Sequence, residues 1–149
     1  MKKLVIEWQR LLDEQKQTCP RCGSTEQEAE KAVQELNQLL NQSEIVVNLV
    51  KKAIDPVSFK KDVLQSNKIL IAGKTLEEWV GAKTGQSKCC ETCGDAECRT
   101  VEYADETHEA IPADLIVRAG LVAAARLFDV EMPQTTERIP VLKIHSKRR

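Results

Sequence analysis

The chain has 149 residues, of which 42% are hydrophobic and 30% are charged, a composition typical of a globular domain with one core. Its formal net charge of −1 argues against a nucleic-acid-binding surface. No apolar run approaches the ~20 residues that a membrane span needs, so no membrane contact is expected either.

The first elements predicted along the chain are a strand and a long helix. Apolar and β-branched residues over 3–8 indicate the strand, and a polar connection follows over 9–18. Ser24 and Gln27 then form a capping-box pattern, which predicts that a helix begins there. The apolar face of this helix repeats at helical spacing and comprises Ala29, Ala32, Val33, Leu36 and Leu40.

Further strands and short helices are predicted after this helix. We expect a strand over 44–54, a short helix over 57–65 after Asp55-Pro56, and a strand over 68–73. The segment "TLEEWVGAKTG" predicts one helical turn, and 86–98 is predicted to be a cysteine-rich loop.

The last third of the chain predicts two short strands and a closing helix. The strands surround the turn "ADE" within 99–111, and Pro112 opens the helix. We therefore expect one domain over 1–129, with a cysteine-rich insertion at 74–98. A flexible basic tail is expected over 130–149.

This element order, β-α-β-α-β-β-α, predicts an α/β fold. The first two strands should pair in parallel across the helix between them, and the later strands can extend the same sheet antiparallel. A Cys-x-x-Cys motif at the first strand–helix junction of such a unit is the thioredoxin-like redox signal.

Six cysteines lie in two short motifs, "CPRC" and "CCETCGDAEC". The start "MKKLVIEWQRLL" lacks a long apolar run and a cleavage site, so it predicts a strand and not a signal peptide. A cytoplasmic, reducing location is therefore expected. In such a location, clusters of cysteines indicate redox chemistry or metal binding more often than structural disulfides. Structural disulfides within the second motif remain an alternative.

Cys19 and Cys22 are the candidate catalytic pair. A thiolate is the nucleophile in disulfide exchange, and a helix N-terminus together with the charge of Arg21 would stabilise it. Cys19 would attack, and Cys22 would resolve the mixed disulfide. Asp114, in the first turn of the last helix, is a second candidate for modulating this pair.

The same motif is also compatible with metal binding. "CPRCG" and "CETCG" both resemble zinc knuckles, and together they would supply four thiolates for tetrahedral zinc. The second motif alone offers four candidate metal ligands, to which Cys19 and Cys22 can be added. An iron–sulfur cluster or a soft ion such as As(III) or Hg(II) would accept the same ligands. The four candidates are Cys89, Cys90, Cys93 and Cys98.

The segments "TCPRCGST", "SNKILIAGKTLEEW" and "CCETCGDAECRTVEY" resemble a thioredoxin-like bacterial and archaeal family catalogued as a domain of unknown function. The resemblance covers roughly residues 2–128 and implies a thioredoxin-like fold. In that fold, the connection between the third and fourth strands lies at the sheet end away from the CxxC motif. The insertion would then have to return by some ~15–20 Å, about one strand length, to reach Cys19 and Cys22.

Two functions from different classes follow. The first is a thiol–disulfide oxidoreductase or dithiol relay at Cys19 and Cys22, with the second cysteine cluster as a metal site or a second dithiol. Its partners would be protein thiols and disulfides. The alternative is a non-catalytic protein that binds soft metals or metalloids through both motifs, with zinc or an iron–sulfur cluster as candidate cofactors.

Overall fold

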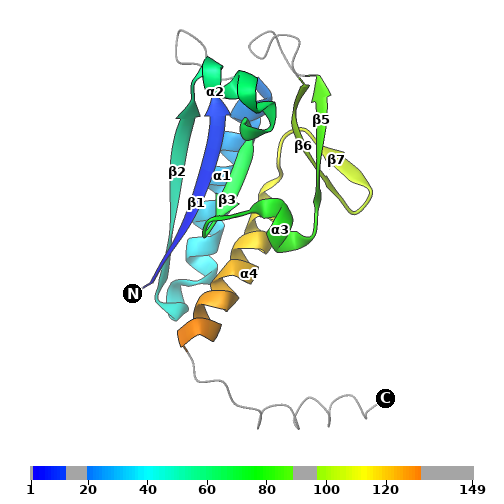
Figure 1. The fold of residues 1–149 in the computed structure, drawn as a ribbon. Helices are drawn as coiled ribbons and strands as arrows, with labels where there is room; N and C mark the ends of the chain where they lie inside the picture. The colour runs from blue at the N-terminus through cyan, green and yellow to red at the C-terminus, as the bar shows by residue number, and fades with distance from the viewer. Residues whose placement is uncertain (1, 13–19, 89–96, 132–149) are drawn as a thin grey trace, which may run out of the picture.

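A computed structural model describes residues 2–12, 20–88 and 97–131 of the chain. It contains two β-sheets and two long helices (Figure 1). Within the described residues, no helix combines the length and the apolar character needed to cross a membrane.

The first sheet has four strands in the order β2-β1-β3-β4. β1 (Lys2–Leu11) pairs in parallel with β2 (Ile45–Ile54), and the helix α1 (Pro20–Leu39) connects them. β3 (Lys68–Ile71) pairs antiparallel with β1 and with the short β4 (Lys74–Thr75). The mixed α/β class predicted from the sequence is therefore confirmed.

Short helical segments connect these strands. A 3-10 turn (Asn41–Ser43) precedes β2, while α2 (Pro56–Lys61) and a second 3-10 turn (Val63–Gln65) lie between β2 and β3. α3 (Leu76–Val80) follows β4. The short helices expected from the sequence are thus present.

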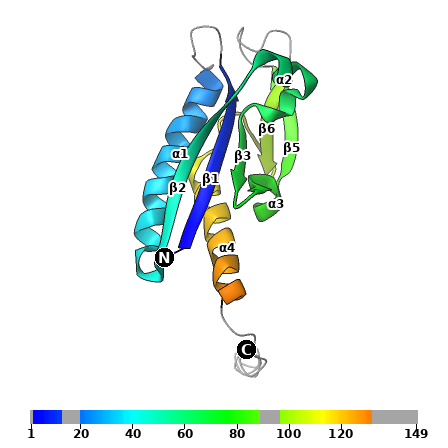
Figure 2. The same cartoon turned by 60° about the vertical axis from the view of Figure 1, so that its left-hand side comes forward.

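The second sheet is an antiparallel arrangement of three strands in the order β5-β6-β7. β5 (Lys83–Lys88) and β6 (Glu97–Tyr103) form its long hairpin, and β7 (Glu106–His108) follows a tight turn. α4 (Ala113–Glu131) then returns to the first sheet. Figure 2 shows this second sheet on the side of β3 away from β1 and β2.

The main core lies between the first sheet and the helices α1 and α4. Leu4, Ile6 and Trp8 alternate along β1 and are fully buried on the face that the helices cover. α1 and α4 approach closely where Leu36 of α1 lies against Gly120 of α4. The core thereby fixes the position of α1 relative to the end of β1.

The start of α1 differs from the prediction. The helix begins at Pro20, inside the CxxC motif, and Ser24 is an exposed residue within it, so the prediction that Ser24 caps the helix is wrong. Proline is favoured in the first helical turn because its missing N–H has no acceptor there in any case. Cys22 therefore belongs to the helix itself.

The later strands also differ from the prediction. They do not extend the first sheet but form a sheet of their own, because 83–88 pairs with 97–102 along a continuous antiparallel register. The segment 86–98 was expected to be a loop, yet both of its ends are strand, and Cys98 lies within β6. Residues 132–149, including most of the expected tail, lie outside the described residues.

Candidate dithiol site

Cys22 lies in the first turn of α1 and is 1% exposed. Its Sγ atom is 3.7 Å from Oγ of Ser66, within hydrogen-bonding distance for sulfur. The same Oγ accepts a hydrogen bond of 3.2 Å from the backbone N–H of Leu11, at the end of β1. One serine therefore connects the first turn of α1 to the end of β1 and the start of β3.

The position of Cys22 at a helix N-terminus has a chemical consequence. The first N–H groups of a helix have no intrahelical acceptor and carry a partial positive charge, which favours a nearby thiolate. Cys19, the predicted attacking cysteine, lies outside the described residues, one position before the first residue of α1. The helix thus begins between the two cysteines of the motif.

Arg21 makes contacts that were not predicted. Its guanidinium donates hydrogen bonds to the backbone carbonyl oxygens of Ser87, at 3.3 Å, and Lys88, at 2.6 Å. It also forms an ion pair of 3.3 Å with Glu109, and the arginine side chain is only 7% exposed. The structure therefore shows that Arg21 binds the end of β5. Its role in stabilising the thiolates of Cys19 and Cys22 stays a prediction.

This contact brings the flank of the second cysteine motif to the first. Lys88 directly precedes Cys89 in the chain, and its carbonyl oxygen accepts a hydrogen bond from Arg21, one of the two residues between Cys19 and Cys22. β5 is long enough to cover the distance that such a return needs, because six extended residues span about 20 Å. Figure 1 shows β5 running from α3 to the end of the molecule where α1 begins. Cys89, Cys90 and Cys93 lie outside the described residues.

Cys98 has a different environment from that of Cys22. It is fully buried in β6 and packs in an apolar cluster with Leu11, Ile54 and Phe59. Within residues 2–12, 20–88 and 97–131, no group of three or more His, Cys, Asp or Glu side chains is placed to hold a metal ion.

Asp114 is exposed in the first turn of α4. The start of this helix is bound to α1 by two hydrogen bonds, from the backbone N–H of Ala113 to Glu28 and from that of Ile111 to Thr25. These contacts are farther along α1 than Cys22. Asp114 itself lines a pocket of about 330 Å³ beside β7, together with Tyr103, His108 and Arg118.

Comparison with known proteins identifies the family. Residues 4–120 match a family model described as "Domain of unknown function (DUF2703)". The chain belongs to this family. A protein of Archaeoglobus fulgidus, described as uncharacterized, is 40% identical over 114 residues, which cover 76% of this chain and 82% of that protein. No solved structure matches the chain.

In this member of the DUF2703 family, several residues of the site were missed by reasoning from the sequence. Ser66, Glu109 and the carbonyl groups at the end of β5 contact the first turn of α1 from segments that are distant in the chain. None of them belongs to a recognisable motif.

Proposed function

We propose that this protein is a thioredoxin-like thiol–disulfide exchange protein of the cytoplasm whose reactive dithiol is Cys19 and Cys22. The observation that carries the proposal is the burial of Cys22 in the first turn of α1, with its sulfur 3.7 Å from Oγ of Ser66. A buried second cysteine at a helix N-terminus suits the resolving role, since only the first cysteine must meet a substrate.

The exchange consists of two thiolate attacks. The thiolate of Cys19 attacks one sulfur of a protein disulfide, which forms a mixed disulfide and releases the other sulfur as a thiolate. The thiolate of Cys22 then attacks the sulfur of Cys19 and releases the second substrate thiolate. The substrate gains two electrons and two protons, and the Cys19–Cys22 pair becomes a disulfide.

The architecture of the first sheet supports the thioredoxin-like part of the proposal. β1, α1, β2, α2, β3 and β4 follow the order that the family resemblance implies, with β1 and β2 parallel across the helix α1. The CxxC motif then stands at the first strand–helix junction, where the redox signal requires it.

The β5–β6 hairpin supports a relay between the two cysteine motifs. The bond of 2.6 Å from Arg21 to the carbonyl oxygen of Lys88 holds the residue before Cys89 at the start of α1. Cysteines of the second motif would then act as a second dithiol that reduces the Cys19–Cys22 disulfide by the same two attacks.

The same convergence favours one alternative, a soft-metal or metalloid site built from both motifs. Thiolates from "CPRCG" and "CETCG" are a suitable ligand set for zinc or for an iron–sulfur cluster.

The test compares disulfide reduction and metal content in cysteine variants of the full chain purified without oxygen. We expect Cys19→Ser to abolish reduction of a protein disulfide, and Cys22→Ser to trap the mixed disulfide detectable by mass spectrometry. Cys98→Ala is the matched control and should retain exchange, since this cysteine is buried away from substrate.

The opposite result would identify the alternative. If Cys19→Ser and Cys93→Ser each lower the zinc or iron content measured by plasma mass spectrometry, and no variant changes disulfide reduction, the chain is a metal-binding protein.

A further inference from the structure

The hydroxyl of Ser66 has one proton, and the contacts around it determine where that proton points. Ser66 is fully buried just before β3, and its Oγ accepts a hydrogen bond of 3.2 Å from the backbone N–H of Leu11. Within the described residues, the other polar atom at hydrogen-bonding distance from this Oγ is Sγ of Cys22, at 3.7 Å. A hydroxyl that accepts from an N–H still has its own proton to donate. That proton is therefore directed at the sulfur of Cys22.

The residue after Ser66 fixes the hydroxyl in this place. The backbone N–H of Asn67 donates to the carbonyl oxygen of Gln9 at 2.7 Å. Asn67 is also fully buried, and its side chain donates to the carbonyl oxygen of Glu109 at 2.9 Å. Its φ of 63° is a left-handed conformation that asparagine adopts more readily than most residues. These contacts hold Ser66 at the end of β1, beside the first turn of α1.

The ionisation state of Cys22 decides which of the two atoms donates. In the thiol, either the sulfur or the hydroxyl oxygen can be the donor. In the thiolate, the sulfur has no proton, so the hydroxyl of Ser66 must donate. Because Cys22 is only 1% exposed, water supplies little of the solvation that a thiolate needs, and burial by itself disfavours the charged form. A fixed hydroxyl donor offsets that loss, because a hydrogen bond to an ionised acceptor is stronger than one to a neutral acceptor.

Charged side chains at the start of α1 and on the segments beside it make their contacts with other groups. The group that the structure places 3.7 Å from the sulfur is a neutral hydroxyl, so its effect does not depend on an ionisation of its own. The contacts of the charged side chains are those of Arg21 with Glu109, Glu26 with Lys51, Arg10 with the ring of Trp8, and Asp62 with the backbone N–H of Leu64.

We infer that Ser66 takes part in the proposed exchange by donating a hydrogen bond to the thiolate of Cys22, the nucleophile of the second attack. The inference rests on the proposed function. Only the thiolate is nucleophilic, and a donor to the ionised sulfur raises the fraction of Cys22 that is ionised near neutral pH. The N-terminus of α1 acts in the same direction, so the two effects add.

The experiment measures the ionisation of Cys22 in the reduced full chain by NMR. The chain is labelled with carbon-13 at the β-carbon of cysteine, and the signal that is lost in Cys22→Ser is the signal of Cys22. Ser66→Ala removes the hydroxyl, and Ser66→Thr retains one. Thr25→Ala is the matched control, because Oγ1 of this fully buried threonine also accepts a backbone N–H, that of Ile111 at 3.1 Å. Both alanine variants leave a backbone N–H without its acceptor, but only Ser66→Ala removes a donor from the sulfur.

We expect Ser66→Ala to lower the acid dissociation constant of Cys22 by about tenfold, which raises its apparent pKa by about one, because a hydrogen bond to a charged group is lost. Ser66→Thr and Thr25→Ala should leave this pKa close to that of the unmodified protein. The decay of the mixed disulfide should slow in Ser66→Ala near neutral pH and recover as the pH rises, when Cys22 is ionised again. A purely structural role of Ser66 would lower this rate at every pH.

A second measurement needs no variant and decides the matter if Ser66→Ala does not fold. In the unmodified protein, the buried hydroxyl proton of Ser66 should exchange slowly with water, and its NMR signal should move downfield as Cys22 ionises. A hydroxyl signal that ignores this ionisation, or an equal pKa of Cys22 in Ser66→Ala, rejects the inference while the exchange proposal stands. Unchanged disulfide reduction in Cys22→Ser would instead reject the proposed function, and the inference with it.

Discussion

At the residue scale, neighbouring positions of the CxxC motif have opposite surroundings. Arg21 reaches outward to the backbone of β5, whereas Cys22 turns inward to Ser66. Consecutive residues of a helix point about 100° apart, so the start of α1 within the motif separates the two side chains. One turn of helix thereby contacts both the core and the second sheet.

A single-residue effect that pH can test is the capping box of α3. Hydrogen bonds from the backbone N–H and the hydroxyl of Thr75 hold the pKa of Glu78 below its ordinary value of 4.5. A lowered folded-state pKa stabilises the protein above the unfolded value, and this stabilisation is lost as pH falls through the folded-state pKa. We expect Glu78→Gln to weaken the fall in Tm between about pH 5 and pH 3.

A second variant pair checks the cause of that lowered pKa. Thr75→Val removes the hydroxyl but keeps the backbone donor, so the pKa of Glu78 measured by NMR should rise part of the way toward 4.5. Thr75→Ser retains a hydroxyl and should leave the pKa low. A Glu78 pKa that is insensitive to Thr75→Val would contradict the assignment to this hydroxyl.

At the element scale, the close approach of α1 and α4 depends on a missing side chain. A Cβ atom at Gly120 would lie 2.6 Å from Cδ1 of Leu36, which is fully buried and therefore restricted in how it can move. Small alanine side chains are buried along α4, which packs on α1 as well as on the first sheet.

Gly120→Val should therefore destabilise the protein by about 1–3 kcal/mol, as overpacking of a dense core does. Urea denaturation monitored by circular dichroism measures the change in the free energy of unfolding. Gly23→Ala is the matched control, because nothing lies within 4 Å of a Cβ at that helical glycine. That control should stabilise the protein by about 0.5–1 kcal/mol, and equal losses in both variants would refute the packing argument.

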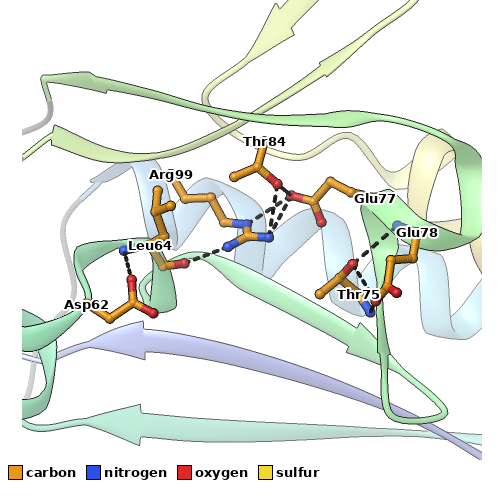
Figure 3. Close-up of polar contacts among 7 residues, drawn as sticks. All are labelled: Asp62, Leu64, Thr75, Glu77, Glu78, Thr84 and Arg99. Carbon is orange, nitrogen blue, oxygen red and sulfur yellow. Dashed lines mark hydrogen bonds and ion pairs between the residues drawn. The ribbon is translucent and has the colours of Figure 1, made fainter.

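At the scale of the whole molecule, a buried ion pair joins the second sheet to the rest of the fold (Figure 3). Nε of Arg99 in β6 donates to Oε2 of Glu77 in α3 at 2.9 Å, and both side chains are less than a tenth exposed. The same guanidinium donates to the carbonyl oxygen of Leu64 at 2.7 Å and to Oγ1 of Thr84 at 3.3 Å. Arg99 thus connects β6 with α3, β5 and the turn before β3.

Breaking this pair should loosen the docking of the β5–β6 hairpin. We expect Glu77→Gln to lower the free energy of unfolding by about 3–5 kcal/mol, because it leaves a buried charge without its partner. In a double-mutant cycle with Arg99→Met, the combined loss should be smaller than the sum of the two single losses.

The control for this cycle is an exposed pair. Lys31→Gln removes the charge that lies 3.9 Å from Glu28 on the surface of α1, and it should change stability by less than about 1 kcal/mol. Additive losses at Glu77 and Arg99 would show that the buried pair does not act as a unit.

The sequence by itself determined the α/β class, the strands β1, β2 and β3 and the apolar face of α1. These features follow from local periodicity, because the spacing of apolar residues a few positions apart predicts whether a segment is a strand or a helix. It also indicated Cys19 and Cys22 as a candidate pair, since their spacing is local too.

Only the tertiary structure decided which distant segments meet. β5 pairs with β6 in a separate sheet. Arg21 contacts the carbonyl oxygen of Lys88, which lies 67 positions away in the chain. A backbone carbonyl group gives no sequence signal, because every residue has one. A single serine such as Ser66 gives none either, because its role depends on which residues the fold places beside it. The start of α1 at Pro20 also depends on tertiary contacts, because Ser66, before β3, contacts both Leu11 at the end of β1 and Cys22 in the first turn of that helix.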